Sequence, residues 1–126
     1  MARLHVVALG GRLPDWAETA CAGYAKRMPK GYQVARTEAL PRKVRIVALD
    51  ERGKDLTTAQ FAELLKAETT FVIGGPDGLP NEMRGKADLL LRLSSLTLPH
   101  ALAQVVLMEQ IYRAATLLTG HPYHRG

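Results

Sequence analysis

The sequence contains one cysteine and no long apolar run. Cys21 has no partner with which to form an internal disulfide, so a disulfide-stapled fold is excluded, and such sparse cysteine usage fits a reducing cytoplasm. No apolar stretch reaches the roughly 20 residues that cross a bilayer. Residues 1–16 have too short an apolar part and lack the small-residue cleavage site of a signal peptide. We therefore expect a cytoplasmic protein without a membrane anchor.

Metal-ligand clusters and common nucleophile motifs are missing as well. His121 and His124 lie three residues apart, but Pro122 between them argues against a pair of ligands on one helix. Neither cysteines nor carboxylates complete a zinc set. The sequence has no Gly-x-Ser-x-Gly elbow, no G-x-G-x-x-G fingerprint and no P-loop. We therefore expect no metal site and no hydrolase triad.

The net charge of +5 is unevenly distributed along the 126 residues. Residues 1–45 carry nine Lys or Arg and three Asp or Glu, whereas residues 46–126 carry eight and nine. The excess comes from Lys26, Arg27, Lys30, Arg36, Arg42, Lys43 and Arg45. A one-sided basic surface fits a polyanion such as nucleic acid. Charge alone slightly favours an ordinary solvated face.

Apolar runs alternate with helical patterns along the chain. The runs expected to form strands are residues 4–9, 32–40, 45–50, 69–75 and 88–93. Helical patterns cover residues 14–28, a segment that begins with a capping box at residues 57–60, a short segment over residues 81–87 that Gly85 breaks, and residues 101–119. Alternation of this kind predicts an α/β fold with a mainly parallel sheet and helices on both faces. The length fits a single domain over residues 1–126.

Three segments follow predicted strands and are candidate walls of one site. They read LDERGKDL (49–56), IGGPDGLP (73–80) and LSSLTLPH (93–100). In open parallel sheets, ligands bind beyond the carboxyl ends of the strands. The glycines permit close backbone approach, and Asp77 would repel a phosphate. Residues 73–80 alone fit a plain tight turn, but the three segments together favour a neutral or cationic ligand held by backbone groups.

The helix over residues 101–119 is apolar on more than one face. The helix around Trp16 and Tyr24 also offers large apolar groups. A small domain cannot cover all of this surface by itself, so we expect an isologous dimer.

The segment HPYHRG over residues 121–126 gathers two histidines, a tyrosine and an arginine. A frayed polar end is the usual interpretation of such a segment. The long helix before it would, however, deliver these groups to a fixed place. Tyr and His rings can stack on a nucleobase, and Arg can pair with a phosphate or a base edge.

Several motifs together carry a family resemblance. IGGPDG, LSSLTLPH and HPYHR, in this order, resemble the RlmH family of SPOUT-class methyltransferases. Residues 8–30 resemble the N-terminal strand and helix of that family, and RIVALDERGK (45–54) resembles its first cofactor loop. One departure is that family members usually carry a longer, Lys-rich segment where this chain passes directly from EALPRK to VRIVALD. A helix is therefore missing there, which alters the surface near Pro41–Arg45.

The resemblance implies a SPOUT fold with a C-terminal trefoil knot, a homodimer, and S-adenosylmethionine as cofactor. It implies methylation of N3 of a pseudouridine in large-subunit (23S) ribosomal RNA, on the assembled ribosome. The cofactor-binding residues that it implies are Leu49, Asp50, Gly74, Gly75, Ser94, Ser95, Leu96, Thr97, Leu98 and Pro99.

The resemblance also assigns the chemistry to the tail. The N3 imide proton must leave, and His124 or His121 is the candidate base. Arg125 stabilises the developing imide anion or holds a phosphate, and Tyr123 completes the catalytic set. In a family-like dimer the tail of one chain completes the site of the other. Two alternatives stay open: a non-catalytic RNA-binding α/β domain, and a doubly wound enzyme that uses another nucleotide cofactor.

Overall fold

A computed structural model of the protein describes residues 2–41 and 44–124. Its strands are β1 (Ala2–Ala8), β2 (Tyr32–Thr37), β3 (Arg45–Asp55), β4 (Thr69–Ile73) and β5 (Leu89–Arg92). Its α-helices are α1 (Asp15–Lys26), α2 (Thr58–Glu63), α3 (Asn81–Lys86) and α4 (His100–Thr119). Short 3-10 turns cover η1 (Leu64–Lys66) and η2 (Pro122–His124).

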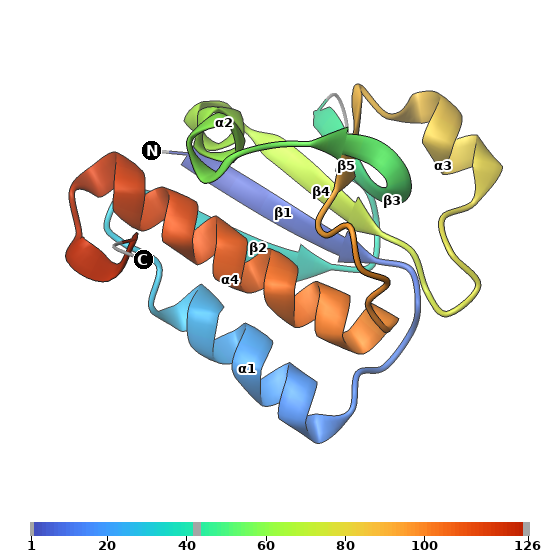
Figure 1. Ribbon diagram of the computed structural model, residues 1–126. Coiled ribbons are helices and arrows are strands. Elements are labelled where there is room, and N and C mark those ends of the chain that lie inside the picture. The colour runs from blue at the N-terminus through green and yellow to red at the C-terminus, as the bar shows by residue number, and fades with distance from the viewer. Residues whose placement is uncertain (1, 42–43, 125–126) are drawn as a thin grey trace.

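The strands form one five-stranded sheet in the order β2-β1-β4-β3-β5 (Figure 1). Every pair of neighbouring strands is parallel, which confirms the predicted sheet. The central strand β4 is buried along its whole length, in agreement with its uninterrupted apolar sequence. None of these pairings tests the trefoil knot, which stays a prediction.

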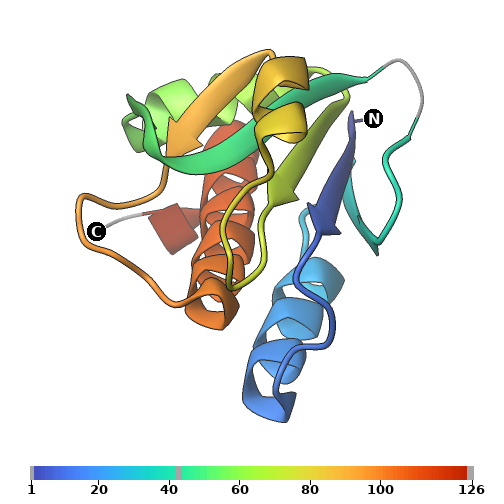
Figure 2. The same ribbon diagram turned by 90° about the vertical axis from the view of Figure 1, so that its right-hand side faces the viewer.

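Helices cover both faces of the sheet, as predicted. On one face, Leu4 and Phe71 pack with Leu107 and Ile111 of α4 in the main core, to which α1 and α2 also contribute. On the other face, a smaller cluster around Val72 is covered by α3 and by Leu40. Figures 1 and 2 show α1 and α4 side by side, with α3 apart from them.

The inner face of α1 differs from the one predicted. The spacing of Trp16, Ala20, Tyr24 and Met28 predicts one apolar stripe, but the residues that α1 buries fully are Ala17 and Cys21. Trp16 keeps 56% of its surface exposed. Small side chains let the backbone of α1 lie close to α4, whereas an indole at this place would hold the two helices apart. Cys21 is a core residue, as its position on the helix predicts, and burial raises the pKa of its thiol.

Two other elements differ from their predicted form. Residues 51–55, expected as a loop, continue β3 through a register shift between Leu49 and Lys54. Gly53 permits this close pairing, because a Cβ atom there would lie 2.7 Å from backbone atoms of Leu90 and Leu91. Gly85 does not break α3, which runs from Asn81 to Lys86.

The helix ends follow their predicted signals. Thr57 and Gln60 form the capping box of α2, with the Gln60 backbone N–H donating to the Thr57 side chain and the Thr57 N–H to the Gln60 side chain. Gly120 caps the C-terminus of α4 at a φ of 76°, a left-handed conformation that favours glycine. Pro99 is the N-cap of α4, so the helix begins within the third candidate segment.

Residues 38–44 carry the chain from β2 to β3, past β1 and β4. Because β2 and β3 are parallel, this connection must also return along the length of the sheet. Its described residues contain no helix. This agrees with the sequence, in which the longer segment usual in the resembled family is missing.

Several of the cations in the basic N-terminal part make internal contacts. Arg36 forms a two-pronged ion pair with Glu18, with both N–O distances at 2.8 Å. Arg45 donates to the carbonyl of Leu64 and to the hydroxyl of Thr69. These side chains tie the sheet to its helices, so they do not form a free basic surface.

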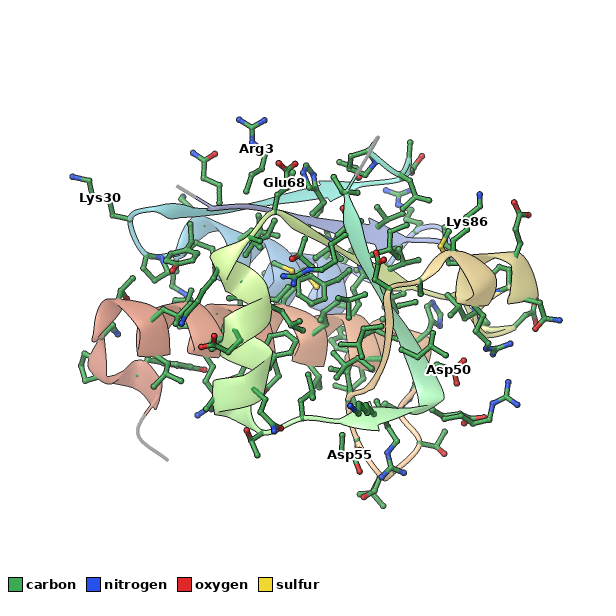
Figure 3. The ribbon with its side chains drawn as sticks, turned by 90° about the horizontal axis from the view of Figure 1, so that it is seen from above. Arg3, Lys30, Asp50, Asp55, Glu68 and Lys86 are labelled. Carbon is green, nitrogen blue, oxygen red and sulfur yellow. The ribbon has the colours of Figure 1, made fainter. Side chains whose placement is uncertain are left out.

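Arg3, Lys26, Arg27 and Lys30 remain exposed, and Figure 3 shows Arg3 and Lys30 projecting from the molecule. Arg42 and Lys43 lie outside the described residues. The basic surface predicted from the charge distribution is therefore smaller than the count of Lys and Arg indicates.

Candidate functional site

An open cavity of about 800 Å³ lies at the carboxyl ends of β4 and β5, beside the middle of β3. Three segments line it: residues 49–51 of β3, residues 73–79 from the end of β4 onward, and residues 91–94 and 96–100 with Ala103. Figure 2 looks onto the last two segments. The cavity brings together nine of the ten predicted cofactor residues, namely Leu49, Asp50, Gly74, Gly75, Ser94, Leu96, Thr97, Leu98 and Pro99. Ser95 is exposed and does not line it.

The glycines after β4 are required by the packing of the chain itself. Gly78 closes a tight turn by donating its N–H to the carbonyl of Gly75 at 2.9 Å, with a φ of 87°. A Cβ atom at Gly74 would lie 2.6 Å from the Gly78 backbone, and one at Gly75 would lie 2.6 Å from the Cα atom of Gly10. A Gly75→Val variant would therefore report on the fold before it reports on a ligand.

The third segment, residues 93–100, combines a locally bent backbone with apolar side chains. The hydroxyl of Ser94 accepts a hydrogen bond from the Leu96 N–H at 2.9 Å, which bends the loop locally. Leu98 is half-buried, whereas Leu96 is 75% exposed at the edge of the cavity. The hydroxyl thus organises the loop, and the leucines provide an apolar surface for a ligand.

Asp50 is a buried carboxylate that joins β3 to α3. One oxygen accepts the Arg52 backbone N–H at 2.8 Å, and the other forms an ion pair with Arg84. Burial alone would raise the pKa of Asp50, but the hydrogen bond from Arg52 and the pair with Arg84 together hold the pKa below its ordinary value. Asp50 is therefore ionised at neutral pH and already occupied, which makes it a poor general base.

We expect Asp50→Asn to lower the free energy of unfolding at pH 7 by about 1–3 kcal/mol, because Arg84 would lose its charged partner. The pKa of Asp50 is lower in the folded than in the unfolded state, so its charge stabilises the fold at every pH above the unfolded-state pKa of about 3.9. That contribution is lost as the pH falls below this value. Urea titrations at several pH values should show a weaker acid dependence in the variant than in the wild type, and equal slopes would contradict this role.

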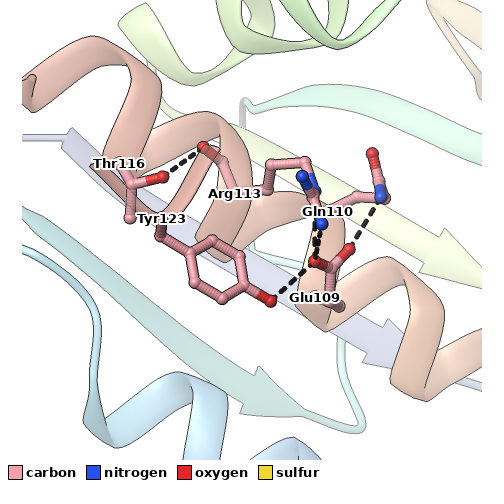
Figure 4. A network of polar contacts seen from close by, with 5 residues as sticks. All are labelled: Glu109, Gln110, Arg113, Thr116 and Tyr123. Carbon is pink, nitrogen blue, oxygen red and sulfur yellow. Dashed lines mark hydrogen bonds and ion pairs between the residues drawn. The ribbon is translucent and has the colours of Figure 1, made fainter. Parts of the chain in front are cut away.

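The tail lies against the C-terminal half of α4. The hydroxyl of Tyr123 donates to Oε2 of Glu109 at 2.8 Å, and Arg113 donates to the same oxygen (Figure 4). The Tyr123 ring meets the ring of Tyr112 edge-on, with centroids 4.6 Å apart. Tyr123 is therefore half-buried and anchored, whereas His121 is exposed.

The other predicted catalytic groups are less fully described. His124 ends η2, and its side chain lies outside the described part of the structure, as does Arg125. The cavity meets α4 at its first turn, up to Ala103, whereas the tail contacts it from Glu109 to Thr116. At about 1.5 Å per residue, the nearest of these contacts lies roughly 9 Å from Ala103 along the helix. A single chain therefore does not bring its own tail contacts to its own cavity.

Arg84, Ala103 and Glu109 lie outside the three predicted segments and the tail. Arg84 and Ala103 line the cavity, and Glu109 holds the tail. Their roles depend on contacts between segments that are distant in the sequence. The one local signal is the i,i+4 pair of Glu109 and Arg113 on a helix.

Two absences apply to residues 2–41 and 44–124. Within these residues, no group of three or more His, Cys, Asp or Glu side chains could hold a metal ion. None of the helices described there is long and apolar enough to cross a membrane.

Comparison with known proteins gives consistent matches over the chain. A family model described as "Predicted SPOUT methyltransferase" matches residues 33–124. Proteins named "Ribosomal RNA large subunit methyltransferase H" from Paraburkholderia phymatum and Polynucleobacter asymbioticus are 44% and 45% identical over 154 and 145 residues. Each match covers 98% of this chain and 99% of the relative. Both matches are longer than the chain, so these relatives carry additional residues.

Solved structures resemble the fold. A "probable methylase family protein" from Haemophilus influenzae Rd KW20 superposes with a TM-score of 0.63 at 14% identity, over 98% of this chain and 70% of that one. The SpoU methyltransferase AviRb from Streptomyces viridochromogenes, in complex with the cofactor AdoMet, gives a TM-score of 0.54 at 14% identity, over 95% and 61% of the two chains. At these identities the likeness concerns the fold alone.

Proposed function

The chain belongs to the SPOUT methyltransferase family, and from this membership we propose that it transfers a methyl group from S-adenosylmethionine to large-subunit (23S) ribosomal RNA. The methylated atom is N3 of a pseudouridine, and the substrate is the assembled ribosome. The observation that carries the proposal is the cavity built from three segments, each of which contributes to the family resemblance. The single domain acts in the cytoplasm.

The cavity suits S-adenosylmethionine in size and chemistry. Its volume of about 800 Å³ lies within the range of roughly 300–1,000 Å³ that is usual for small-molecule sites. Leu91, Leu96 and Leu98 offer apolar contacts to an adenine ring, and the turn at Gly75–Gly78 exposes backbone groups. Glu51 and Asp77 place negative charge at the wall, which favours a ligand that carries a sulfonium cation.

The bound cofactor would supply an electrophilic methyl group. The chain has to align the N3 atom with that methyl group, exclude water and accept the imide proton. In the proposed assignment His124 accepts the proton from N3, with His121 as the other candidate. Arg125 stabilises the imide anion, and Tyr123 belongs to the same tail.

A homodimer would bring the tail and the cavity together. Two copies of α4 packed antiparallel across a two-fold axis place the C-terminal half of one helix beside the first turn of the other. Trp16 at 56% exposure and Leu102 at 37% are large apolar side chains at the start of α1 and α4, where such a contact would cover them.

We expect sedimentation analysis at micromolar concentration to show a dimer. A second copy would cover the exposed apolar side chains and would bring its tail to the cavity of the first. A Leu102→Glu variant should sediment as a monomer and lose methyl transfer, since charge would be placed in the contact. The control Glu63→Gln, at the exposed end of α2, should stay dimeric. A stable and fully active monomer would refute the dimer.

The function is tested with ribosomes from a strain that lacks the enzyme. Incubation with labelled S-adenosylmethionine should transfer the label to large-subunit RNA, and mapping should place the product on a pseudouridine. Calorimetry with S-adenosylmethionine separates this function from a non-catalytic RNA-binding domain. A folded protein that binds RNA, does not bind the cofactor and transfers no label would favour the non-catalytic RNA-binding domain.

A further inference from the structure

Glu109 gathers more hydrogen bonds than an ordinary helix-surface carboxylate. Its Oε2 atom accepts from the Tyr123 hydroxyl at 2.8 Å and from two nitrogens of Arg113 at 2.9 and 3.1 Å. Its Oε1 atom accepts from Gln110 at 2.7 Å. The Glu109 side chain is only 18% exposed. Figure 4 shows that Tyr123 is the partner from outside α4, so this carboxylate links the helix to the tail.

Aromatic packing holds the same tyrosine from the side. The ring of Tyr112 lies edge-on to that of Tyr123, and Tyr24 of α1 lies 5.7 Å beyond Tyr112. The guanidinium of Arg113 lies 5.2 Å from the centre of the Tyr123 ring. We call these contacts around Tyr123 the anchor of the tail. The anchor contains residues of two helices, and it depends on packing as well as on the hydrogen bond to Glu109.

Little chain separates this anchor from the proposed catalytic groups. Gly120 caps α4, and the Tyr123 backbone N–H donates to Nδ1 of His121 at 3.2 Å, so residues 120–123 form a closed turn. His124 follows Tyr123 directly. Tyr123 is therefore fixed both at its hydroxyl and at its backbone.

We propose that Glu109 is a positioning residue, which holds the Tyr123 hydroxyl and thereby sets the place of His124 and Arg125 for methyl transfer. This inference rests on the proposed function, since it presumes that the tail carries the chemistry. Glu109 itself does not line the cavity, so it acts through Tyr123 and not on the cofactor.

The protonation of Tyr123 supports a permanent anchor. Burial raises the pKa of the Tyr123 phenol, and the hydrogen bond to Glu109 raises it further. The phenol therefore stays protonated and remains a donor across the physiological range. The bond to Glu109 holds the tail constantly and does not act as a pH switch.

We expect Glu109→Ala to lower kcat about 10²-fold, the cost of a misplacement of roughly 1 Å in an active site. The KM for S-adenosylmethionine should not change, because the cavity is untouched. Glu109→Gln should lose less, since its amide oxygen can still accept from Tyr123. Glu109→Ala combined with Tyr123→Phe should be no worse than the more damaging single change, because both break one bond.

Two measurements keep the test independent of stability and assembly. Ultraviolet titration, with Tyr123→Phe to identify the signal, should show the Tyr123 phenol ionising at lower pH in Glu109→Ala than in the wild type. The control Glu63→Ala removes the carboxylate from an exposed ion pair with Lys66 and should leave kcat and the titration unchanged. Sedimentation should show the same dimer for all variants.

The outcomes separate the two proposals. A wild-type protein without methyl transfer overturns the proposed function, yet the phenol titration would still decide whether Glu109 holds the tail. Wild-type kcat in Glu109→Ala, fully additive losses in the double variant, or an unchanged phenol titration would each overturn the positioning role. Loss of the dimer in Glu109→Ala would overturn it as well, because the carboxylate would then serve assembly.

Discussion

A chain that ends at Tyr123 is expected to fold, dimerise and bind S-adenosylmethionine like the full chain, and to lose methyl transfer. Removal of His124 and Arg125 takes away the proposed base and the charge at the reacting nitrogen. General acid–base catalysis alone contributes about 10²- to 10⁴-fold, so the loss should be at least of this size. Tyr123 must remain, because its ring packs on Tyr112 and its hydroxyl on Glu109.

This boundary gives a cleaner experiment than deletion of the whole tail. A chain cut before His121 would also expose the Tyr112 ring and leave the Glu109 carboxylate with fewer donors, so lost activity could follow from lost packing. The matched control is a chain that lacks only Gly126, which keeps both proposed catalytic groups and should stay fully active. Calorimetry with the cofactor and single-turnover methylation of ribosomes measure the two properties separately. Full activity of the chain that ends at Tyr123 would refute the catalytic roles of His124 and Arg125.

Local patterns were enough to predict the elements of this fold. The capping box at Thr57, the stop at Gly120 and the apolar run of β4 each act within a few residues, and each appears in the structure as predicted. The order of the strands was not predicted, because neighbours in a parallel sheet are set by contacts across the chain. The exposure of Trp16 has the same origin, since small residues of α1 pack against α4.

The candidate site, too, was predicted only in part from the sequence. Nine of the ten predicted cofactor residues meet at one cavity because parallel strands bring the segments after them to a common edge. The close backbone approach predicted for the glycines is confirmed, since a Cβ atom at Gly75 would lie 2.6 Å from the Cα atom of Gly10. The anchor of the tail could not be predicted, since Glu109 and Tyr123 lie 14 positions apart and no periodic pattern joins them.

Filling the cavity at Ala103 is expected to weaken cofactor binding while the fold persists. Ala103 is half-buried on the first turns of α4 and lines the cavity, so Ala103→Leu adds three carbons to the space proposed for the cofactor. Overpacking of this kind costs about 1–3 kcal/mol. That corresponds to a roughly 5- to 150-fold rise in the Kd for S-adenosylmethionine. Ala59→Leu, on the exposed side of α2, is the matched control and should bind the cofactor normally.

Mixing this variant with the chain that ends at Tyr123 then decides how the site is assembled. In a dimer formed from one chain of each kind, the shortened chain offers an intact cavity and the Ala103→Leu chain offers an intact tail. If the tail acts on the partner's cavity, random exchange of chains gives mixed dimers with one working site and restores about a quarter of the wild-type rate. If the tail serves its own chain, each mixed dimer has a defect in both sites. The rate would then stay at the mean of the two separate variants, and the separation of tail and cavity along α4 would need another explanation.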